Sequence, residues 1–331
     1  MNGEGNDRAR LINAAIEASI EFEKLMDKTD FDSWLNVDTL ETLKNMGQLV
    51  DPFTNYKDNE KKLKEICYQM KREVINNSSN SVVNSSLEED PISKLFYSKH
   101  KRLDARICSD KEDEEKEYNN ALYILLSALN DLQNLERDNK DNMCLILLYN
   151  DLSICYAGLG KSSMSRGYAE EAREIIEKEK SYKEFGKKLS ANNSTNQKDI
   201  KDHDFVSSKL FKLYTIALFN QAEAERRSSL YTEAERNFKR IIKYGAENTC
   251  LINFNHYSAI LYLSLLYIDQ GRGKEAIELL EEVINKSNEA DIRYWKAFIA
   301  KSQALIDQSE YDEAKGLLLI SFLKNKNIAM F

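Results

Sequence analysis

The sequence predicts an all-α protein, and three observations lead to this. The chain of 331 residues contains only 11 Gly and 2 Pro. Hairpins and sandwich corners need residues that accept positive φ or a fixed φ, so a chain this poor in both has few places for strand turns. No short Val/Ile-rich runs with Gly-bearing turns recur, which argues against βαβ units. Apolar residues instead recur at spacings of three and four, the period of an amphipathic helix.

The first 75 residues contain three such helical patterns, at about 8–26, 32–48 and 58–75. In the first pattern, one face carries Leu11, Ala15, Ala18, Phe22 and Leu25. We therefore expect an N-terminal helical bundle over residues 1–75. The Asn/Ser-rich stretch 76–90 cannot bury enough apolar area to offset chain entropy, so we expect a flexible linker there.

The remainder, residues 91–331, contains a repeat. Four segments share an apolar helix, a short turn and a second helix, namely 148–179, 217–245, 259–287 and 297–323. Each second helix carries a small residue at an equivalent place: Ser165, Ala234, Ala276 and Ala314. Their separations are 69, 42 and 38 residues, and the longest contains a soft patch at about 186–203 and a long helix that begins near Phe205. A small residue lets two crossing helices approach closely.

A weaker fifth pair precedes these four. We expect a helix over 92–108, an acidic connector over 109–117, which is most often a solvated loop, and a second helix over 118–135. The predicted architecture of 91–331 is thus a solenoid of four to five helix pairs.

The four pairs resemble tetratricopeptide repeats (TPR), in the extended form of about 40 residues found in bacterial signalling regulators and kinesin light chains. The resemblance implies a right-handed superhelix in which the first helix of each pair lines a concave groove. It also implies a protein or peptide ligand bound in that groove.

Residues just after the packing positions of each first helix are candidates for contact with that ligand. Amides can hold a peptide backbone, Arg and Lys can hold carboxylates, and aromatic rings offer apolar surface. The candidates are Asn150, Asp151, Phe219, Asn220, Glu223, Arg226, Arg227, Tyr262, Asp269, Lys296 and Gln303.

Composition argues against several other classes. The 47 basic and 55 acidic residues give a net charge of −8, so we expect neither nucleic acid nor anionic lipid as a partner. No run of about 18 apolar residues and no signal-like N-terminus occurs, which predicts a cytoplasmic protein without membrane segments. Five scattered cysteines and three distant histidines match no metal or cofactor pattern. No catalytic motif is present, so we predict no enzyme activity.

The sequence ends LLLISFLKNKNIAMF, which is apolar where a solenoid needs a polar capping helix. This tail could fold back on the last pair, be covered by a second chain or domain, or precede further sequence; we favour a covered end. Overall, the sequence predicts a non-enzymatic adaptor that binds a partner protein or peptide in the groove. The alternative is a regulatory sensor subunit that controls an attached or separately encoded effector, such as a protease or signalling protein.

Overall fold

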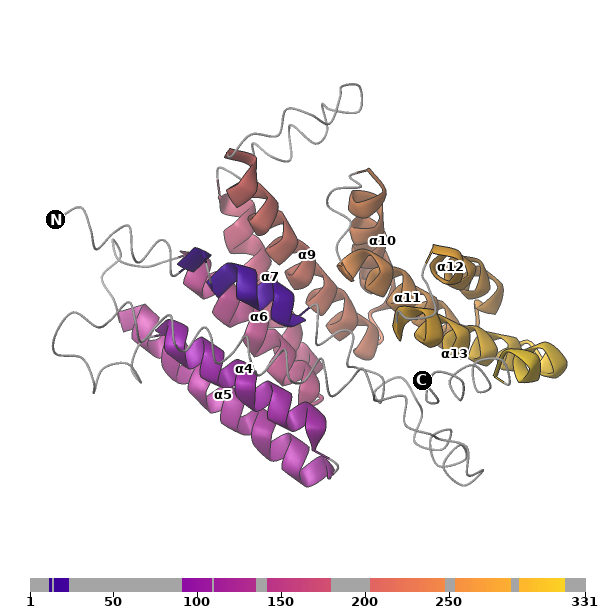
Figure 1. Cartoon of the computed structure of the whole chain (residues 1–331), viewed down its shortest axis with the longest axis horizontal. Coiled ribbons are helices and arrows are strands. Elements are labelled where there is room, and N and C mark those ends of the chain that lie inside the picture. Colours follow the sequence, from indigo (N-terminus) through magenta and orange to yellow (C-terminus); the bar gives the residue numbers. More distant parts are fainter. Residues whose placement is uncertain are drawn as a thin grey trace, which may run out of the picture.

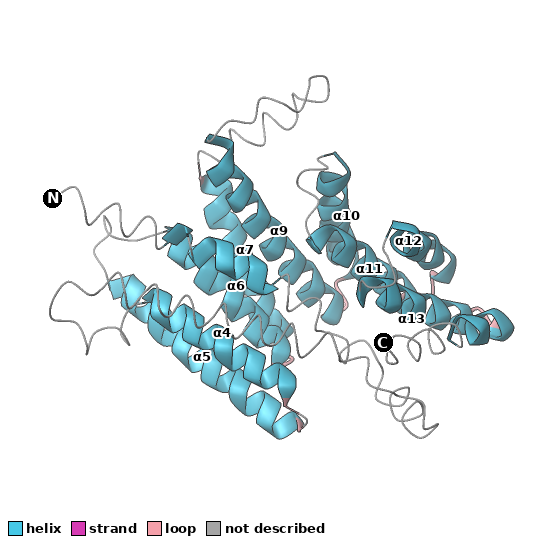
Figure 2. Ribbon diagram, viewed as in Figure 1, coloured by secondary structure: helices cyan, strands magenta, loops and turns pink. Residues whose placement is uncertain are grey.

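The computed structural model describes residues 12–13, 15–23, 91–108, 110–134, 142–179, 203–247, 254–286 and 292–318. Throughout these ranges the regular structure is helical (Figure 2). The expected bundle helices beyond residue 23, the linker 76–90 and the apolar tail after 318 lie outside them, as does most of the patch 186–203.

From Pro91 the helices follow one another as antiparallel pairs, stacked side by side (Figure 1). The pairs are α4 (Pro91–Ile107) with α5 (Lys111–Asn134), α6 (Asn142–Gly158) with α7 (Ser162–Lys178), α9 (His203–Arg227) with α10 (Tyr231–Glu247), and α11 (Phe254–Asp269) with α12 (Gly273–Lys286). After them, α13 (Ile292–Asp307) is followed by the helical residues 311–318. The first helices also contact one another, α4 with α6, α6 with α9, α9 with α11, and α11 with α13. We call their shared surface the first-helix face.

The same turn follows α6, α9, α11 and α13 and joins each of them to the next helix. After α6, Lys161 N–H donates to the Tyr156 carbonyl at 2.8 Å, and Gly160 N–H donates to Ala157 at 3.0 Å. This is a Schellman motif, in which one residue takes the left-handed conformation. That residue is Gly160 (φ 69°), Ser229 (φ 60°), Gly271 (φ 72°) or Ser309 (φ 64°). The recurrence confirms the repeat independently of side chains.

Two of these left-handed positions hold serine, which predicts a simple gain in stability. Left-handed backbone costs a residue with a Cβ about 1 kcal/mol relative to glycine. We therefore expect Ser229→Gly to raise the free energy of unfolding by about 0.5–1 kcal/mol in urea denaturation. The matched control is Gly160→Ala, which adds a Cβ into open space at φ 69° and should lower it by about 1 kcal/mol. A loss of stability in Ser229→Gly would contradict this explanation.

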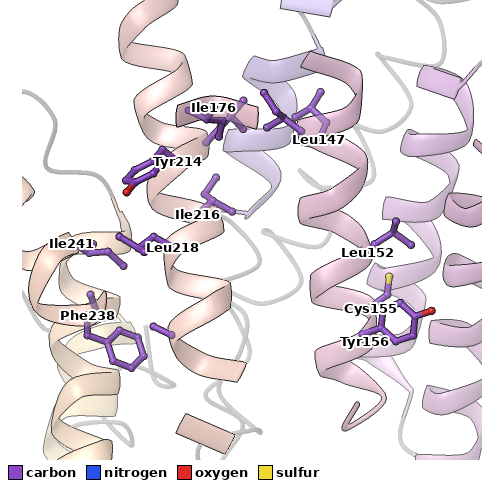
Figure 3. Packing of buried hydrophobic residues seen from close by; sticks show 14 of the residues in the cluster. Leu147, Leu152, Cys155, Tyr156, Ile176, Tyr214, Ile216, Leu218, Phe238 and Ile241 are labelled. Atoms are coloured by element: carbon purple, nitrogen blue, oxygen red, sulfur yellow. The ribbon is translucent and has the colours of Figure 1, made fainter. Parts of the chain in front are cut away.

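The small residues that mark the repeat lie at identical places. In each pair, the backbone N–H of the small residue donates to the carbonyl four positions earlier, which belongs to the last residue of the turn. The four small residues are Ser165, Ala234, Ala276 and Ala314. All four are 0–2% exposed. Around them the core is continuous from pair to pair, and Figure 3 shows buried side chains of α6, α7, α9 and α10 filling the space between helices.

The acidic run that we expected as a connector is helical. Residues 111–117 form the first two turns of α5, and Asp110 accepts the Glu112 N–H at 2.8 Å as an N-cap. Carboxylates near a helix N-terminus stabilise the helix because their negative charge is attracted to the positive end of its dipole. The interpretation as a solvated loop left out this effect on the helix.

The helical residues 15–23 lie against α4 and α9 (Figure 1, indigo). Two ion-pair groups fix this position. Glu23 pairs with Lys99 and Arg102 of α4, and Glu17 pairs with Lys209 of α9 at 2.6 Å. This segment therefore packs on the first-helix face.

Candidate functional site

Three of the candidate residues occupy one repeat position. Each Schellman turn begins with a carbonyl that accepts the N–H of the residue five positions later; after α6, α9 and α11 these carbonyls belong to Tyr156, Glu225 and Tyr267. The three candidates lie five residues before them, namely Asp151 on α6, Asn220 on α9 and Tyr262 on α11. These three helices are neighbours along the stack. The repeat therefore presents a carboxylate, an amide and a phenol in a row along the first-helix face.

Around Tyr262 lies a small aromatic cluster. Its ring meets Phe219 of α9 edge-on, with centroids 5.0 Å apart, and Phe238 of α10 lies 5.8 Å from Phe219. Phe238 is fully buried, whereas Phe219 and Tyr262 are half-buried. Edge-to-face pairs of this kind contribute beyond their buried area. The cluster fixes two partly exposed rings on two adjacent first helices.

The two candidate arginines hold the first helices together. Arg226 pairs with Glu223 at 2.8 Å and with Asp269 of α11 at 2.6 Å. Arg227 also pairs with Glu223, at 2.7 Å, and donates to the Ala157 carbonyl of α6 at 3.1 Å. Burial alone would lower the pKa of Arg226, but Glu223 and Asp269 raise it. These charges are balanced within the chain, so they position the face and leave little free charge for a ligand.

Two candidate amides carry polar atoms that no described residue satisfies. Both amide atoms of Asn150 are buried without a hydrogen-bond partner, and so is the Nδ2 of Asn220. A buried amide that lacks partners costs roughly 1–3 kcal/mol. Asn150 and Asn220 lie on adjacent first helices, α6 and α9. By its chemistry an amide matches a peptide backbone, because both offer a donor and an acceptor.

The most buried group of charges lies where residues 15–23 meet α4 and α6. Asp151 accepts from Lys99 at 2.8 Å and from Arg102 at 2.9 Å. Glu23 accepts two parallel bonds from Arg102, both at 2.9 Å, and one from Lys99 at 3.2 Å. Lys99, Arg102 and Asp151 are only 1–2% exposed. We call Lys99, Arg102 and Asp151 the charge site.

The two carboxylates that share these cations differ in pKa. Burial would raise the pKa of Glu23, but Arg102 and Lys99 lower it to about 2. For Asp151, burial raises the pKa and outweighs the opposing effect of the same two cations. When two acids share one positive site, such a separation is expected. Glu23 is therefore the carboxylate that the site holds most firmly in its charged form.

The last two candidates lie on α13, which packs against α11. Lys296 is 1% exposed. Gln303 is exposed and donates to Asp307 at 2.9 Å, one turn along the same helix. The structure thus brings candidates of α6, α9 and α11 onto neighbouring helices, whereas Gln303 bonds within its own helix.

The site offers binding groups, and the thiol that lies beside it is not activated. Cys155 lies beside the charge site, but its thiol is fully buried, and burial raises its pKa to about 12, well above the range of a reactive thiolate. Among the described residues, no group of three or more His, Cys, Asp or Glu side chains could hold a metal ion. Nor does any described helix combine the length and the apolarity needed to cross a membrane.

Sequence reasoning missed Lys99, Arg102 and Glu23. The sequence did contain a signal for the two cations. Lys99 and Arg102 continue the helical spacing of the apolar residues Ile92 and Leu95, so they are charges on the buried face of a helix. A charge in that place needs a buried partner. The identity of Glu23 as the partner had no signal, because it lies 79 residues from Arg102.

Paired helices with recurrent Schellman turns and small residues at the crossings define a TPR-like solenoid. No family model matches the chain, and no curated protein matches it. The solved structures that it resembles include a Podosopora anserina protein described as a kinesin light chain with nearly identical TPR-like repeats (13% identity, 71% of this chain and 93% of that one, TM-score 0.47). They also include BtubC (BKLC) from P. vanneervenii (15%, 75% and 93%, TM-score 0.46) and NprR in complex with its cognate peptide NprX (13%, 100% and 84%, TM-score 0.47). Because these TM-scores are below 0.5, the fold assignment rests on the helix pairs and turns described above.

Proposed function

We propose that this chain is a non-catalytic binding module that holds a segment of a partner protein against its first-helix face. The observation that carries the proposal is the set of unpartnered amides of Asn150 and Asn220. Asn220 follows half-buried Phe219 on α9, and Asn150 and half-buried Tyr262 lie on the two first helices that flank α9, namely α6 and α11. Together these groups offer hydrogen bonds to a peptide backbone and apolar contact to its side chains.

The rigidity of the face supports the same proposal. Arg226 and Arg227 connect α9 to α11 and to α6, so the rings and amides are held before any partner arrives. A preorganised surface loses less conformational entropy on binding. We expect moderate affinity, because the free polar groups are few.

A regulatory sensor is the second candidate function. The observation that favours it is that residues 15–23 pack on the face that we assign to the partner. A partner that binds there changes where this segment lies, and an effector can respond to that change.

Site-specific photo-crosslinking tests the proposed function. The photoreactive residue p-benzoylphenylalanine replaces Tyr262 in one variant and Tyr123 in another, and both are irradiated in the native cells. Tyr123 is the matched control because it is 78% exposed on α5, a second helix. We expect cross-linked partner protein from position 262, lost on adding Asn150→Ala, and none from position 123. Equal cross-linking at both positions would contradict the proposal.

A further inference from the structure

The segment of residues 15–23 covers the first-helix face with one stripe of its surface. Ala15, Ile16, Ser19 and Phe22 are 0–3% exposed, and their spacing places them on a single side of the helix. Ala15 and Ile16 join the main hydrophobic core. The segment therefore lies on this face as an amphipathic helix lies in a binding site for a partner helix.

Phe22 and Glu23 form the most specific part of this contact. The Lys99 ammonium lies 5.1 Å from the centroid of the Phe22 ring, and the Arg102 guanidinium lies 5.5 Å from it. The same two cations bind the adjacent Glu23 carboxylate, which Arg102 holds with two parallel hydrogen bonds. Lys99 and Arg102 thus recognise an aromatic ring and a carboxylate on consecutive residues.

The charge site requires an anion from outside itself. It holds two cations against the single carboxylate of Asp151, and while residues 15–23 cover it all three side chains are nearly inaccessible to water. A buried charge without a counter-ion is costly, so any helix that covers this site in place of residues 15–23 must bring a carboxylate to the position of Glu23. Next to Asp151 in sequence, Asn150 is buried, and its amide atoms and the Oδ2 of Asp151 have no hydrogen-bond partner among the described residues.

We propose that the charge site is a receptor for an acidic amphipathic helix in which an aromatic residue directly precedes a carboxylate, and that Phe22–Glu23 fill it until a partner helix of this chemistry displaces them. This inference rests on the proposed function, because it names the partner chemistry for the same face. The 67 residues between Glu23 and Pro91 keep the displaced segment attached, so it competes at an effective concentration on the order of millimolar.

The first experiment uses a synthetic fluorescent peptide that covers residues 8–26 as the probe. The full-length Phe22→Ala/Glu23→Gln variant leaves the charge site without its internal ligand. We expect this variant to bind the peptide at least tenfold more tightly than the wild-type chain does, by fluorescence anisotropy. A peptide with the same two substitutions is the matched control and should bind neither protein. Equal affinity of the wild type and the variant for the unaltered peptide would overturn the proposal.

A second measurement needs no variant and guards against misfolding of the first. Hydrogen exchange of the wild-type chain is followed by mass spectrometry with and without millimolar unlabelled peptide. We expect faster exchange in the chain's own residues 15–23 and unchanged exchange in α12. If neither displacement nor binding is seen, residues 15–23 are a permanent part of the core and the inference is wrong. Cross-linking at position 262 would then still stand, so the failure of this inference can be told from failure of the proposed function.

Discussion

Replacing Asp151 with alanine should lower the free energy of unfolding by about 3–5 kcal/mol at neutral pH, because it breaks a buried ion pair from one side. Lys99 and Arg102 would keep only Glu23 as counter-ion, and neither cation can reach water, as both are 1% exposed. Urea denaturation followed by circular dichroism measures the change.

Asp269→Ala is the matched control for this substitution. Asp269 also pairs with an arginine of a neighbouring first helix, at 2.6 Å, but its side chain is 39% exposed. Exposed pairs contribute about 0–1 kcal/mol, so this variant should stay close to wild type. If both variants lost the same stability, burial of the charge site would not be what makes Asp151 important.

Replacing Phe238 with alanine should have a comparable effect, a loss of about 3–5 kcal/mol, by leaving a cavity in the core. Phe238 is fully buried on α10 and supports the rings of both Phe219 and Tyr262. We expect thermal and urea unfolding to shift together, and we expect the partner cross-link at position 262 to weaken because its supporting ring is gone.

The control for Phe238 is Tyr123→Ala. Tyr123 is 78% exposed, so its removal leaves no cavity and should change stability by no more than about 0.5 kcal/mol. A Phe238→Ala variant as stable as Tyr123→Ala would show that the aromatic cluster does not hold α9, α10 and α11 together.

The repeat could be predicted from the sequence because its determinants are local. The small residues Ser165, Ala234, Ala276 and Ala314 and the glycines of two turns lie within a few residues of the contacts that they make possible. Ser229 and Ser309 take the same left-handed conformation without a glycine signal, since the two hydrogen bonds of the Schellman turn require it. Local patterns therefore found the pairs and missed part of the turn chemistry.

The candidate site could be predicted only in part. Asp151, Asn220 and Tyr262 follow from the repeat register, which places one position of each first helix on a common face. The charge site depends on contacts between Glu23 and α4, which are more than 70 residues apart in the sequence. Its two cations also lie on the helix pair α4–α5, whose sequence departs from the repeat. Periodicity identifies which face of a helix is buried and carries no information on which distant segment covers it.

The central claim is that a partner segment binds along the first-helix face, and cross-linking at repeat-equivalent positions tests it most directly. Asn220 and Tyr262 occupy the same place on α9 and α11. The photoreactive residue at either position should capture the same partner protein, through the same stretch of its sequence, whereas position 123 on α5 should capture none. Different partners at 220 and 262, or a partner captured only at 123, would contradict the claim.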